Sequence, residues 1–545
     1  MFRHAIRLQR GQTLGYGAAF ALTALAVGAT YAKVAGTTAA SRAAFAHGVA
    51  ELAAQFSYLM PQPHRLGTLA GYLLWKGWGA LPIVAAIWAV LAASGAARGD
   101  ENRHLVDAWL ACGTPRRTLV ATRLAAFGCA SGVAAVARAA GSLLGAVGPG
   151  GGVPAAGLAA QTAAFWLFTW ACFALCYLVA QLPGSASGAY AATGGVMLAL
   201  YLLDVAGRSA AAMHPLAWMS PFRWYDATDA LAPGGHVSVA GLSLCVALLI
   251  VAGVLAAIAF ERRDVGAALW SRPQLRPRVP HRPPSPTGWL TLPVLRLLHR
   301  ERGMVVVWLV VVGLVSVFFV AVAHAVASEL TGAGSVLANA PGLQAFLNLG
   351  GRNPDLAFLS VFWTSVTQLL LAGLAAQLVA AWAADDTGGI LAAMLTRPVS
   401  RTGILWERAG AATVALAAGA AVAAVAAALA AGAQGTSLPL GRLVAATLLF
   451  VPFGLTFAAV GAAAGGRWPR LAAAVLGAFA FASYFWTEVS PFTGWPTWIE
   501  NLSVFRLYGA PMSGPPYWTG LWVMSTIIAT GFAVAIWGIR RRDVA

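Results

Sequence analysis

The sequence contains almost no lysine. Of its 35 basic residues only Lys33 and Lys76 are lysines, and neither stands in a Gly-Lys-Ser/Thr pattern. A Walker A phosphate-binding loop needs that lysine to reach the β- and γ-phosphates of a nucleotide. The chain therefore holds no such loop, and any ATP hydrolysis coupled to it must come from another chain.

Acidic residues are also scarce, with 18 Asp and Glu among 545 residues. Almost all of them fall in loops or at the ends of apolar segments, as Asp204 and Glu488 do. Carriers driven by protons or sodium ions usually place an ionisable residue inside the membrane, where the coupling ion binds. The absence of a mid-membrane carboxylate counts against a carrier of that kind.

Cysteine is too rare to build a disulfide framework, because the five cysteines lie in or beside apolar segments or in loops that we predict to be cytoplasmic. Cys172 and Cys176 share a helix face, but buried cysteines usually behave as small apolar residues. No His, Cys and Asp cluster has the spacing of a metal site, and no Ser-His-Asp assembly can be proposed. We predict no metal and no cofactor bound by this chain itself.

Apolar residues dominate what is present. The chain is 59% hydrophobic and 10% charged, with a mean hydropathy of +0.73, which excludes an ordinary soluble protein. Windows of about 20 apolar residues, long enough to cross a bilayer, recur along its whole length. We predict an all-α integral membrane protein with spans near 13–33, 74–97, 119–145, 155–182, 187–204, 238–260, 304–327, 358–384, 408–433, 440–465, 471–488 and 517–539.

The basic residues orient these spans. With both termini inside, 25 of the 35 fall in cytoplasmic segments and 8 in outer ones, as the positive-inside rule requires. The +17 charge is thus a topology signal and a contact with anionic lipid, and it does not point to nucleic acid. The first span follows three arginines but is long for a signal core, so we interpret it as an uncleaved anchor. The 33 arginines and abundant alanine suggest a GC-rich bacterial genome, so we expect a multi-pass protein of the bacterial plasma membrane.

Similar motifs recur in the same order in the two halves of the sequence, which indicates a tandem duplication. Glu261-Arg-Arg-Asp264 after the sixth span returns as Arg540-Arg-Arg-Asp543 after the twelfth. Further echoes pair Ser220-Pro-Phe with Ser503-Val-Phe at an offset of 283, and pair Arg117 with Arg401 and Glu101 with Asp385 at 284. We predict a first six-helix half at 1–265, a Pro/Arg-rich cytoplasmic linker at 266–292 and a second six-helix half at 293–545. Since each half has an even number of spans, the halves should be parallel repeats about a pseudo-twofold axis along the membrane normal.

Each half carries a short polar segment between its second and third spans. Each segment begins with acids, continues as a short amphipathic helix, and ends with a proline and an arginine. Acids favour a helix start and proline ends a helix. Such a helix could simply lie on the lipid headgroups; its duplication favours docking of a twofold partner. The candidate coupling residues are Glu101, Asp107, Pro115 and Arg117 in the first segment and Asp385, Asp386, Pro398 and Arg401 in the second.

These segments resemble the coupling helix of type-two ABC transporter permeases, which have the six-span type V exporter fold. Pro398-Val-Ser-Arg401 is the closer match, and Gly113-Thr-Pro115 has its proline shifted by one position. The Ser-Pro-Phe segment and the Arg-Arg-Asp exit are also similar to that family. The double length resembles the polyketide-antibiotic or tetronasin exporter permeases, and the resemblance covers nearly the whole chain.

The resemblance implies a mechanism. Two copies of a separately encoded ABC ATPase subunit, which bind ATP and Mg, would dock beneath the two coupling helices. Their closure would drive export of an amphipathic or hydrophobic compound such as an antibiotic, a drug or a lipid. Basic approach helices at 3–10 and 295–302 would lie along the inner leaflet.

Aromatic residues gather in the outer segments before the sixth and twelfth spans. The family resemblance implies that they form an outer gate, whereas the general alternative is an interfacial aromatic belt. The candidate gate residues are Phe222, Arg223, Tyr225, Phe505, Arg506 and Tyr508.

Two other functions stay open from the residues alone. A secondary multidrug carrier is disfavoured by the missing intramembrane acids. An integral-membrane lipid or glycosyl transferase would need acids or histidines clustered at one face, and the outer loops offer only scattered ones. The sequence does not identify the substrate, because an apolar cavity suits lipids, polyketides and drugs alike.

Overall fold

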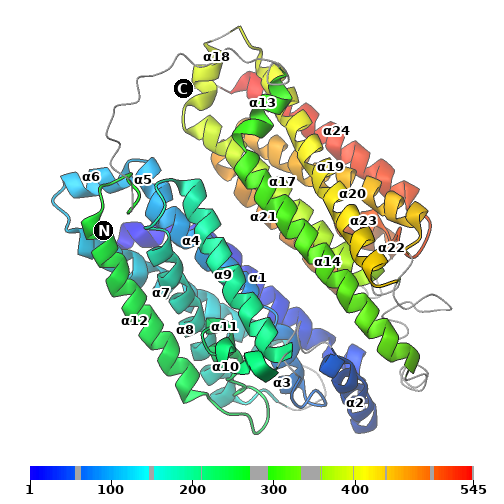
Figure 1. Cartoon of the computed structure of the whole chain (residues 1–545). Coiled ribbons are helices and arrows are strands. Elements are labelled where there is room, and N and C mark those ends of the chain that lie inside the picture. Colours follow the sequence, from blue (N-terminus) through cyan, green and yellow to red (C-terminus); the bar gives the residue numbers. More distant parts are fainter. Residues whose placement is uncertain are drawn as a thin grey trace. The chain divides into compact units, whose positions relative to one another are not determined.

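The structure is a computed structural model that describes most of the chain. The described residues are 1–55, 63–146, 152–209, 211–269, 292–332, 356, 359–396, 398–435, 438–490 and 496–542. Within these ranges every regular element is a helix (Figure 1). The all-α prediction is therefore confirmed.

The chain divides into two compact units, Met1–Arg278 and Val279–Ala545. The division falls inside the predicted linker. Residues 270–291 of that linker lie outside the described residues. Residues before them still belong to unit 1, since the Leu269 amide donates to the carbonyl of Leu182 at 3.2 Å.

Unit 1 is built from long helices joined by short ones. The long helices are α1 (Phe2–Ala35), α4 (Pro82–Ser94, extended at both ends), α7 (Arg116–Gly145), α8 (Ala155–Val179), α9 (Ala186–Ser209) and α12 (Val239–Arg262). The shorter ones are α2 (Ala39–Gln55), α3 (Leu69–Tyr72), α5 (Asp100–Asn102), α6 (Leu105–Ala111), α10 (His214–Ala217) and α11 (Pro221–Asp226). Figure 1 shows α6 at one end of unit 1 and α10 and α11 at the other.

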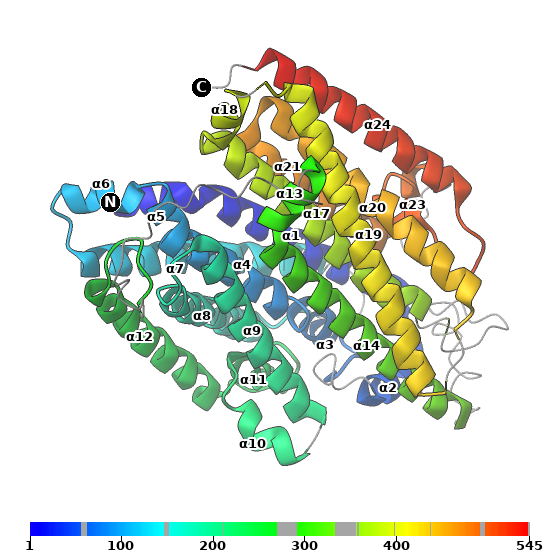
Figure 2. The ribbon, with the colours of Figure 1, turned by 45° about the horizontal axis from the view of Figure 1, so that its top comes forward.

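Unit 2 follows the same plan. Its long helices are α14 (Arg302–Gly332), α17 (Thr364–Thr387), α19 (Arg401–Ala433), α20 (Leu440–Arg467), α21 (Ala472–Val489) and α24 (Trp518–Arg541). Its short helices are α13 (Pro293–Arg300), α18 (Ile390–Leu395), α22 (Thr497–Glu500) and α23 (Val504–Tyr508). Within this unit α18 lies at one end and α23 toward the other (Figure 2).

Twelve helices in the described part of the chain are long and apolar enough to cross a membrane. They coincide with the twelve windows that the sequence predicts. A helix is the only single-segment structure that satisfies all of its backbone hydrogen bonds within lipid. Their outward side chains are large and apolar, as at Leu144, Val239 and Leu440, which are 66%, 73% and 72% exposed. Such surfaces suit contact with lipid tails.

The second span of each unit contains a π-helical turn that the hydropathy pattern does not reveal. These turns are Leu73–Trp78 and Leu359–Trp363. Each ends in a buried tryptophan whose indole N–H donates to a serine, Trp78 to Ser142 at 3.2 Å and Trp363 to Ser316 at 3.1 Å. Such turns arise where the helical ladder is interrupted, frequently at functional sites.

Glycines bring certain helices into backbone contact. A Cβ added at Gly28 of α1 would lie 2.8 Å from the carbonyl carbon of Gly145 of α7, and one at Gly538 of α24 would lie 2.9 Å from that of Gly466 in α20. Small residues at helix crossings are the usual means of tight packing in membranes, where the hydrophobic effect does not drive helices together. These contacts fix α1 on α7 and α24 on α20.

The predicted approach helices differ between the units. In unit 1 residues 3–10 are the first turns of α1, which continues without a break into the span. In unit 2 α13 ends at Arg300, and α14 begins at Arg302 after a one-residue break. Pro293 at the first turn of α13 explains where that helix begins, because proline is favoured at that position.

Candidate functional site

Each unit places a short helix directly after its second span. In unit 1 α5 ends at Asn102 and α6 begins at Leu105; in unit 2 α17 ends at Thr387 and α18 begins at Ile390. The residue before each short helix is left-handed, His104 with φ of 57° and Gly389 with φ of 78°. The predicted short helices are therefore present, each set off from its span by a sharp turn.

The following span also begins as predicted. Pro115 is the N-cap of α7, and the Ser400 hydroxyl caps α19 by accepting from the Gly403 amide at 3.0 Å. Pro398 is exposed in the turn between α18 and α19. Proline and an N-cap serine both define where a helix starts.

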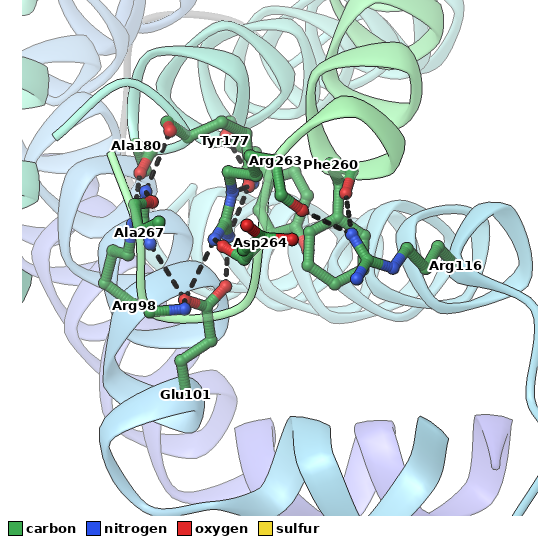
Figure 3. Close-up of polar contacts among 11 residues, drawn as sticks. Arg98, Glu101, Arg116, Tyr177, Ala180, Phe260, Arg263, Asp264 and Ala267 are labelled. Atoms are coloured by element: carbon green, nitrogen blue, oxygen red, sulfur yellow. Dashed lines mark hydrogen bonds and ion pairs between the residues drawn. The ribbon is translucent and has the colours of Figure 1, made fainter. Parts of the chain in front are cut away.

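Glu101 is the centre of a buried ion network in unit 1 (Figure 3). Its carboxylate accepts from Arg98 Nη1 at 2.9 Å and from Arg263 Nη1 at 3.1 Å, with a further bond from Arg263 Nη2. Arg98 also donates to the carbonyls of Ala180, at 3.2 Å, and of Ala267, at 2.9 Å. The network joins the end of the second span to the ends of α8 and α12.

Further charges extend this network. Arg263 donates to the side-chain oxygen of Gln181 at 2.8 Å. Asp100 pairs with Arg123 of α7, whose guanidinium lies 4.5 Å from the ring centroid of Trp109 in α6. Removing one member of a buried ion pair typically costs about 3–5 kcal/mol, because the partner charge stays buried. The end of the second span (α5) is thus fixed to α7 by a buried ion pair, and α6 contacts the same arginine through the ring of Trp109.

The start of α7 is tied to the end of α12. Arg116 Nη1 donates to the carbonyl oxygen of Phe260 at 2.7 Å and to that of Arg263 (Figure 3). Arg117 points elsewhere: its side chain is exposed and pairs with Glu261. An exposed ion pair is screened by water and adds little stability, so Arg116 and not Arg117 holds the two helices together.

Unit 2 contains a matching network. Asp386 accepts from Arg408 of α19 at 2.7 Å and from Arg542 at 2.9 Å. Arg401 Nη1 donates to the carbonyl oxygens of Ile539, at 3.0 Å, and of Arg542, at 2.7 Å. The same three connections therefore occur in each unit: acid to following span, acid to last span, and following span to last span.

The contacts correct two pairings made from the sequence. Arg401 makes the bonds that Arg116 makes, and Asp386 occupies the role of Glu101. Both matches have an offset of 285, as has Arg123 with Arg408. The pairings of Arg117 with Arg401 and of Glu101 with Asp385 were therefore wrong by one residue. Neighbouring like residues in Arg116-Arg117 and Asp385-Asp386 made the sequence ambiguous.

The two networks differ in how much of the space around their charged groups is occupied by side chains. At an offset of 285, Arg98 and Gln181 correspond to Ala383 and Gly466. Those two small residues line a cavity of about 20 Å³ beside Asp386 and Arg408. A water molecule needs roughly 10–15 Å³ by the same measure. Unit 2 thus has room for about one water where unit 1 has side chains.

The remaining predicted coupling residues lie around these networks. Asp107 is exposed on α6, next to His104 at 3.0 Å. Asp385 is buried and pairs with Arg300 of α13 at 2.5 Å. Glu101, Asp385 and Asp386 therefore face into their own units, while Asp107, Arg117 and Pro398 are at the surface.

The predicted gate segments form aromatic clusters at the other end of each unit. Ser220 and Ser503 cap α11 and α23, each accepting from the amide two residues later at 3.2 Å. Phe222, Tyr225, Phe505 and Tyr508 are all buried. The two clusters repeat ring by ring: Trp78, Phe165, Phe168, Phe222 and Tyr225 in unit 1, and Trp363, Phe450, Phe453, Phe505 and Tyr508 in unit 2.

The arginines of these segments bond within their units. Arg223 lies 2.9 Å from the ring of His214, and Arg506 pairs with Glu500. The buried rings pack against protein, which differs from a belt of aromatics facing lipid headgroups. Gating by these six residues stays a prediction.

A buried acid pair accompanies the cluster of unit 1. Asp226, at the end of α11, accepts from Arg208 at 2.6 Å, and Asp204 binds the same guanidinium. Burial raises the pKa of Asp226, and the nearby Asp204 raises it further, although Arg208 opposes both effects. Sequence reasoning placed Asp204 at a boundary but did not find its partners.

Sequence reasoning also missed Arg98, Arg123, Arg408 and Gln181 as network members. The repeated Arg-Arg-Asp exits at 262–264 and 541–543 were the signal that could have drawn attention to Arg263 and Arg542. The acids to which they bind lie more than 150 residues away, so local patterns could not pair them.

Comparison with known families gives one match. Residues 290–540 match the family described as "Multidrug efflux system permease Rv1217c, C-terminal domain". The match supports a membrane permease of an efflux system. It runs from the start of α13 to Arg540 in α24 and so includes Asp386, Arg401 and Arg408 of the network in unit 2, but not Arg542. No curated protein matches the chain.

The match and the fold agree on a multi-pass membrane protein. Twelve helices in the described part of the chain are candidate membrane spans. The same ranges hold no group of three or more His, Cys, Asp or Glu arranged for a metal ion.

Proposed function

We propose that this protein is the membrane permease of an ATP-driven ABC exporter, powered by two copies of a separate ATPase subunit. Its two units would act as parallel six-helix repeats. The substrate would be an amphipathic or hydrophobic compound, such as an antibiotic, a drug or a lipid. The observation that carries the proposal is that in both units an ion network of the same plan fixes the acidic end of the second span, directly before the short helix.

The networks supply a route for mechanical coupling. A partner pressing on α6 would move α7 through Asp100 and Arg123, and α12 through Glu101 and Arg263. In unit 2, Asp386 would carry the same movement from α18 to α19 and α24. Buried ion networks resist local deformation, because separating the charges is costly. Movement of the short helix is thus passed on as movement of whole helices.

The proposal assigns different tasks to the predicted coupling residues. The exposed Asp107, Arg117 and Pro398 would contact the ATPase subunits. The buried acids Glu101, Asp385 and Asp386, together with the half-buried Arg401, would position the short helices. ATP and Mg would bind in the partner subunits, since the chain has no Walker A lysine. The end of unit 1 that carries α6 and the end of unit 2 that carries α18 would each face the cytoplasm, as their basic residues favour.

A secondary carrier remains the alternative, and the buried acids favour it less. Asp100, Glu101, Asp385 and Asp386 lie at span ends, and each is paired with arginine. An ion-coupled carrier needs an acid that is free to release its ion during transport. These acids are instead held by permanent positive charges.

Site-specific photocrosslinking tests the docking. A photoreactive amino acid at Asp107 of α6 or Ile390 of α18, both exposed, should crosslink the ATPase subunit in membranes of the native host. Matched controls are Val239 and Trp518, which are even more exposed, lie at the opposite ends of α12 and α24, and should give no such product. Crosslinks to the ATPase from the controls and none from α6 or α18 would overturn the proposed docking surface.

A further inference from the structure

Arg138 is a buried cation inside a membrane span of unit 1. It belongs to α7 and is 0% exposed. Its guanidinium carbon lies 3.9 Å from the ring centroid of Trp78 and 4.2 Å from that of Phe165. Nη2 donates to the Gly77 carbonyl at 2.6 Å. The side chain is therefore enclosed by aromatic rings and the π-helical turn.

Two nitrogens of the Arg138 guanidinium have no hydrogen-bond partner. Nε and Nη1 of Arg138 are buried and donate no hydrogen bond, and no acid within the described ranges forms an ion pair with it. A charged group in the membrane interior is costly and usually has a partner or lies on a substrate path. Contact with aromatic rings stabilises a cation only partly. The donors of Arg138 thus have unused capacity for an anion.

Unit 2 shows that the aromatic cluster does not need this cation. There Trp363, Phe450 and Tyr508 pack as their counterparts do. The position that corresponds to Arg138, at the same offset of 285 as Arg123 and Arg408, is Ala423. Packing of the cluster therefore does not explain why unit 1 carries an arginine.

A second buried polar residue of unit 1, Gln161, also has an apolar residue at the corresponding position of unit 2. Gln161 of α8 is 0% exposed and lies beside the hydroxyl of Tyr225, which also interacts with Arg138. The corresponding residue of unit 2, at an offset of 285, is Ala446. Polar groups that have no counterpart in unit 2 thus gather around one point, between α7, α8 and the π-helical turn.

We infer that Arg138 is the anion-recognising residue of a ligand site in unit 1. The ligand class is an amphipathic molecule with a carboxylate or phosphate next to an apolar body. The anion would accept a hydrogen bond from Nη1 or Nε, whose N–H bonds point to different sides of the guanidinium, and the rings of Trp78 and Phe165 would contact the apolar part. Gly77 and Trp78 belong to the π-helical turn, so a shift of that turn would open the site. The identification of this ligand as the exported compound rests on the proposed function.

Binding to the purified full chain tests the site without ATP. The protein is reconstituted in phosphatidylcholine nanodiscs and titrated with dansyl-undecanoic acid and with its uncharged methyl ester. The wild type should bind the acid about tenfold more tightly than the ester, as expected for a charged hydrogen bond. The Arg138→Gln variant should lose this preference, and the matched control Phe450→Ala, in the cluster of unit 2, should keep it.

Several outcomes would overturn the site. They are equal affinity of the wild type for both probes, retention of the preference by a monodisperse Arg138→Gln protein, or its loss in Phe450→Ala. If Arg138→Gln does not fold, a diazirine derivative of the acid is crosslinked to the wild type. Labelled peptides from α7 or α8 support the site, whereas labelling confined to α19 and α20 overturns it.

A further titration, with anionic lipid in the nanodiscs, distinguishes a lipid headgroup from a free amphipathic anion as the ligand. Adding phosphatidylglycerol to the nanodiscs should suppress acid binding if a lipid headgroup occupies the site. Unchanged binding assigns the site to a free amphipathic anion. Because no nucleotide is present, failure of the ATP-driven mechanism would leave these results intact, and failure of the site would leave the ATPase proposal intact.

Discussion

Arg116 and Arg401 make the same two bonds in different units. Arg116 donates to the carbonyl oxygens of Phe260 and Arg263, and Arg401 to those of Ile539 and Arg542. Each arginine thereby joins the first turn of one long helix to the carbonyl end of another. A cation is favoured at a helix C-terminus, where the carbonyl groups lack partners within the helix.

Reversing the charge of Arg401 should separate ATP hydrolysis from transport. Arg401→Glu removes the direct link between α19 and α24 and leaves only the bond from Arg542 to Asp386, so movement of α18 would reach α24 less completely. We expect transport to fall by about tenfold, within the range of coupling energies between distant sites, while ATPase activity and folding persist. Transport and ATPase activity are measured together in proteoliposomes that contain the ATPase subunit.

Arg117→Glu is the matched control for that variant. Arg117 is exposed and pairs with Glu261, so its charge reversal should leave α7 attached to α12 through Arg116. A weaker contact with the ATPase subunit would lower ATPase activity and transport together and would not separate them. A much greater loss of coupling in Arg117→Glu than in Arg401→Glu would contradict the assignment of roles.

Neutralising Glu101 should destabilise unit 1. Glu101→Gln leaves Arg98 and Arg263 buried beside each other without a counter-charge, and we expect a loss of about 3–5 kcal/mol. Thermal unfolding in mild detergent measures it as a lower melting temperature. Asp107→Asn, which removes an exposed acid, should change stability by less than about 1 kcal/mol; equal effects of the two variants would show that the network is not structural.

The turn before α18 should depend on a glycine. Gly389 has φ of 78°, and a side chain in this left-handed region costs roughly 1–2 kcal/mol. Gly389→Ala should lower the melting temperature. Gly441→Ala should raise it slightly, because a Cβ there meets nothing within 4 Å and alanine favours a helix. If both substitutions shifted the melting temperature in the same direction, the result would contradict a left-handed turn at Gly389.

Asp226 should make stability depend on pH. Because its pKa is raised in the folded protein, the native state retains a proton that the unfolded chain loses near pH 4. Stability from this group is present below about pH 4 and declines as the pH rises from there through the folded pKa. The melting temperature of the wild type should therefore fall over that range, and Asp226→Asn should remove this part of the fall. The exposed Asp264→Asn is the control and should retain it.

The sequence predicted the spans and the presence of the polar segments, but not how the charges pair. Span prediction succeeds because the bilayer sets helix length and composition locally. Pairing of Glu101 with Arg263 spans 162 positions and depends on helix packing. The sequence did not predict the π-helical turn at Leu73–Trp78, because such a turn changes the backbone hydrogen bonding but not the hydropathy. Arg138 was visible in a span, yet its missing partner could be found only in three dimensions.

Purification of the tagged chain from its native host in mild detergent tests the central claim most directly. The co-purifying chains are identified, their stoichiometry is measured, and ATPase activity is assayed before and after reconstitution. We predict an ABC ATPase subunit at two copies per chain, with ATP hydrolysis that depends on the permease. A chain that purifies alone from several detergents, and that transports without ATP when reconstituted, would contradict an ATP-driven exporter.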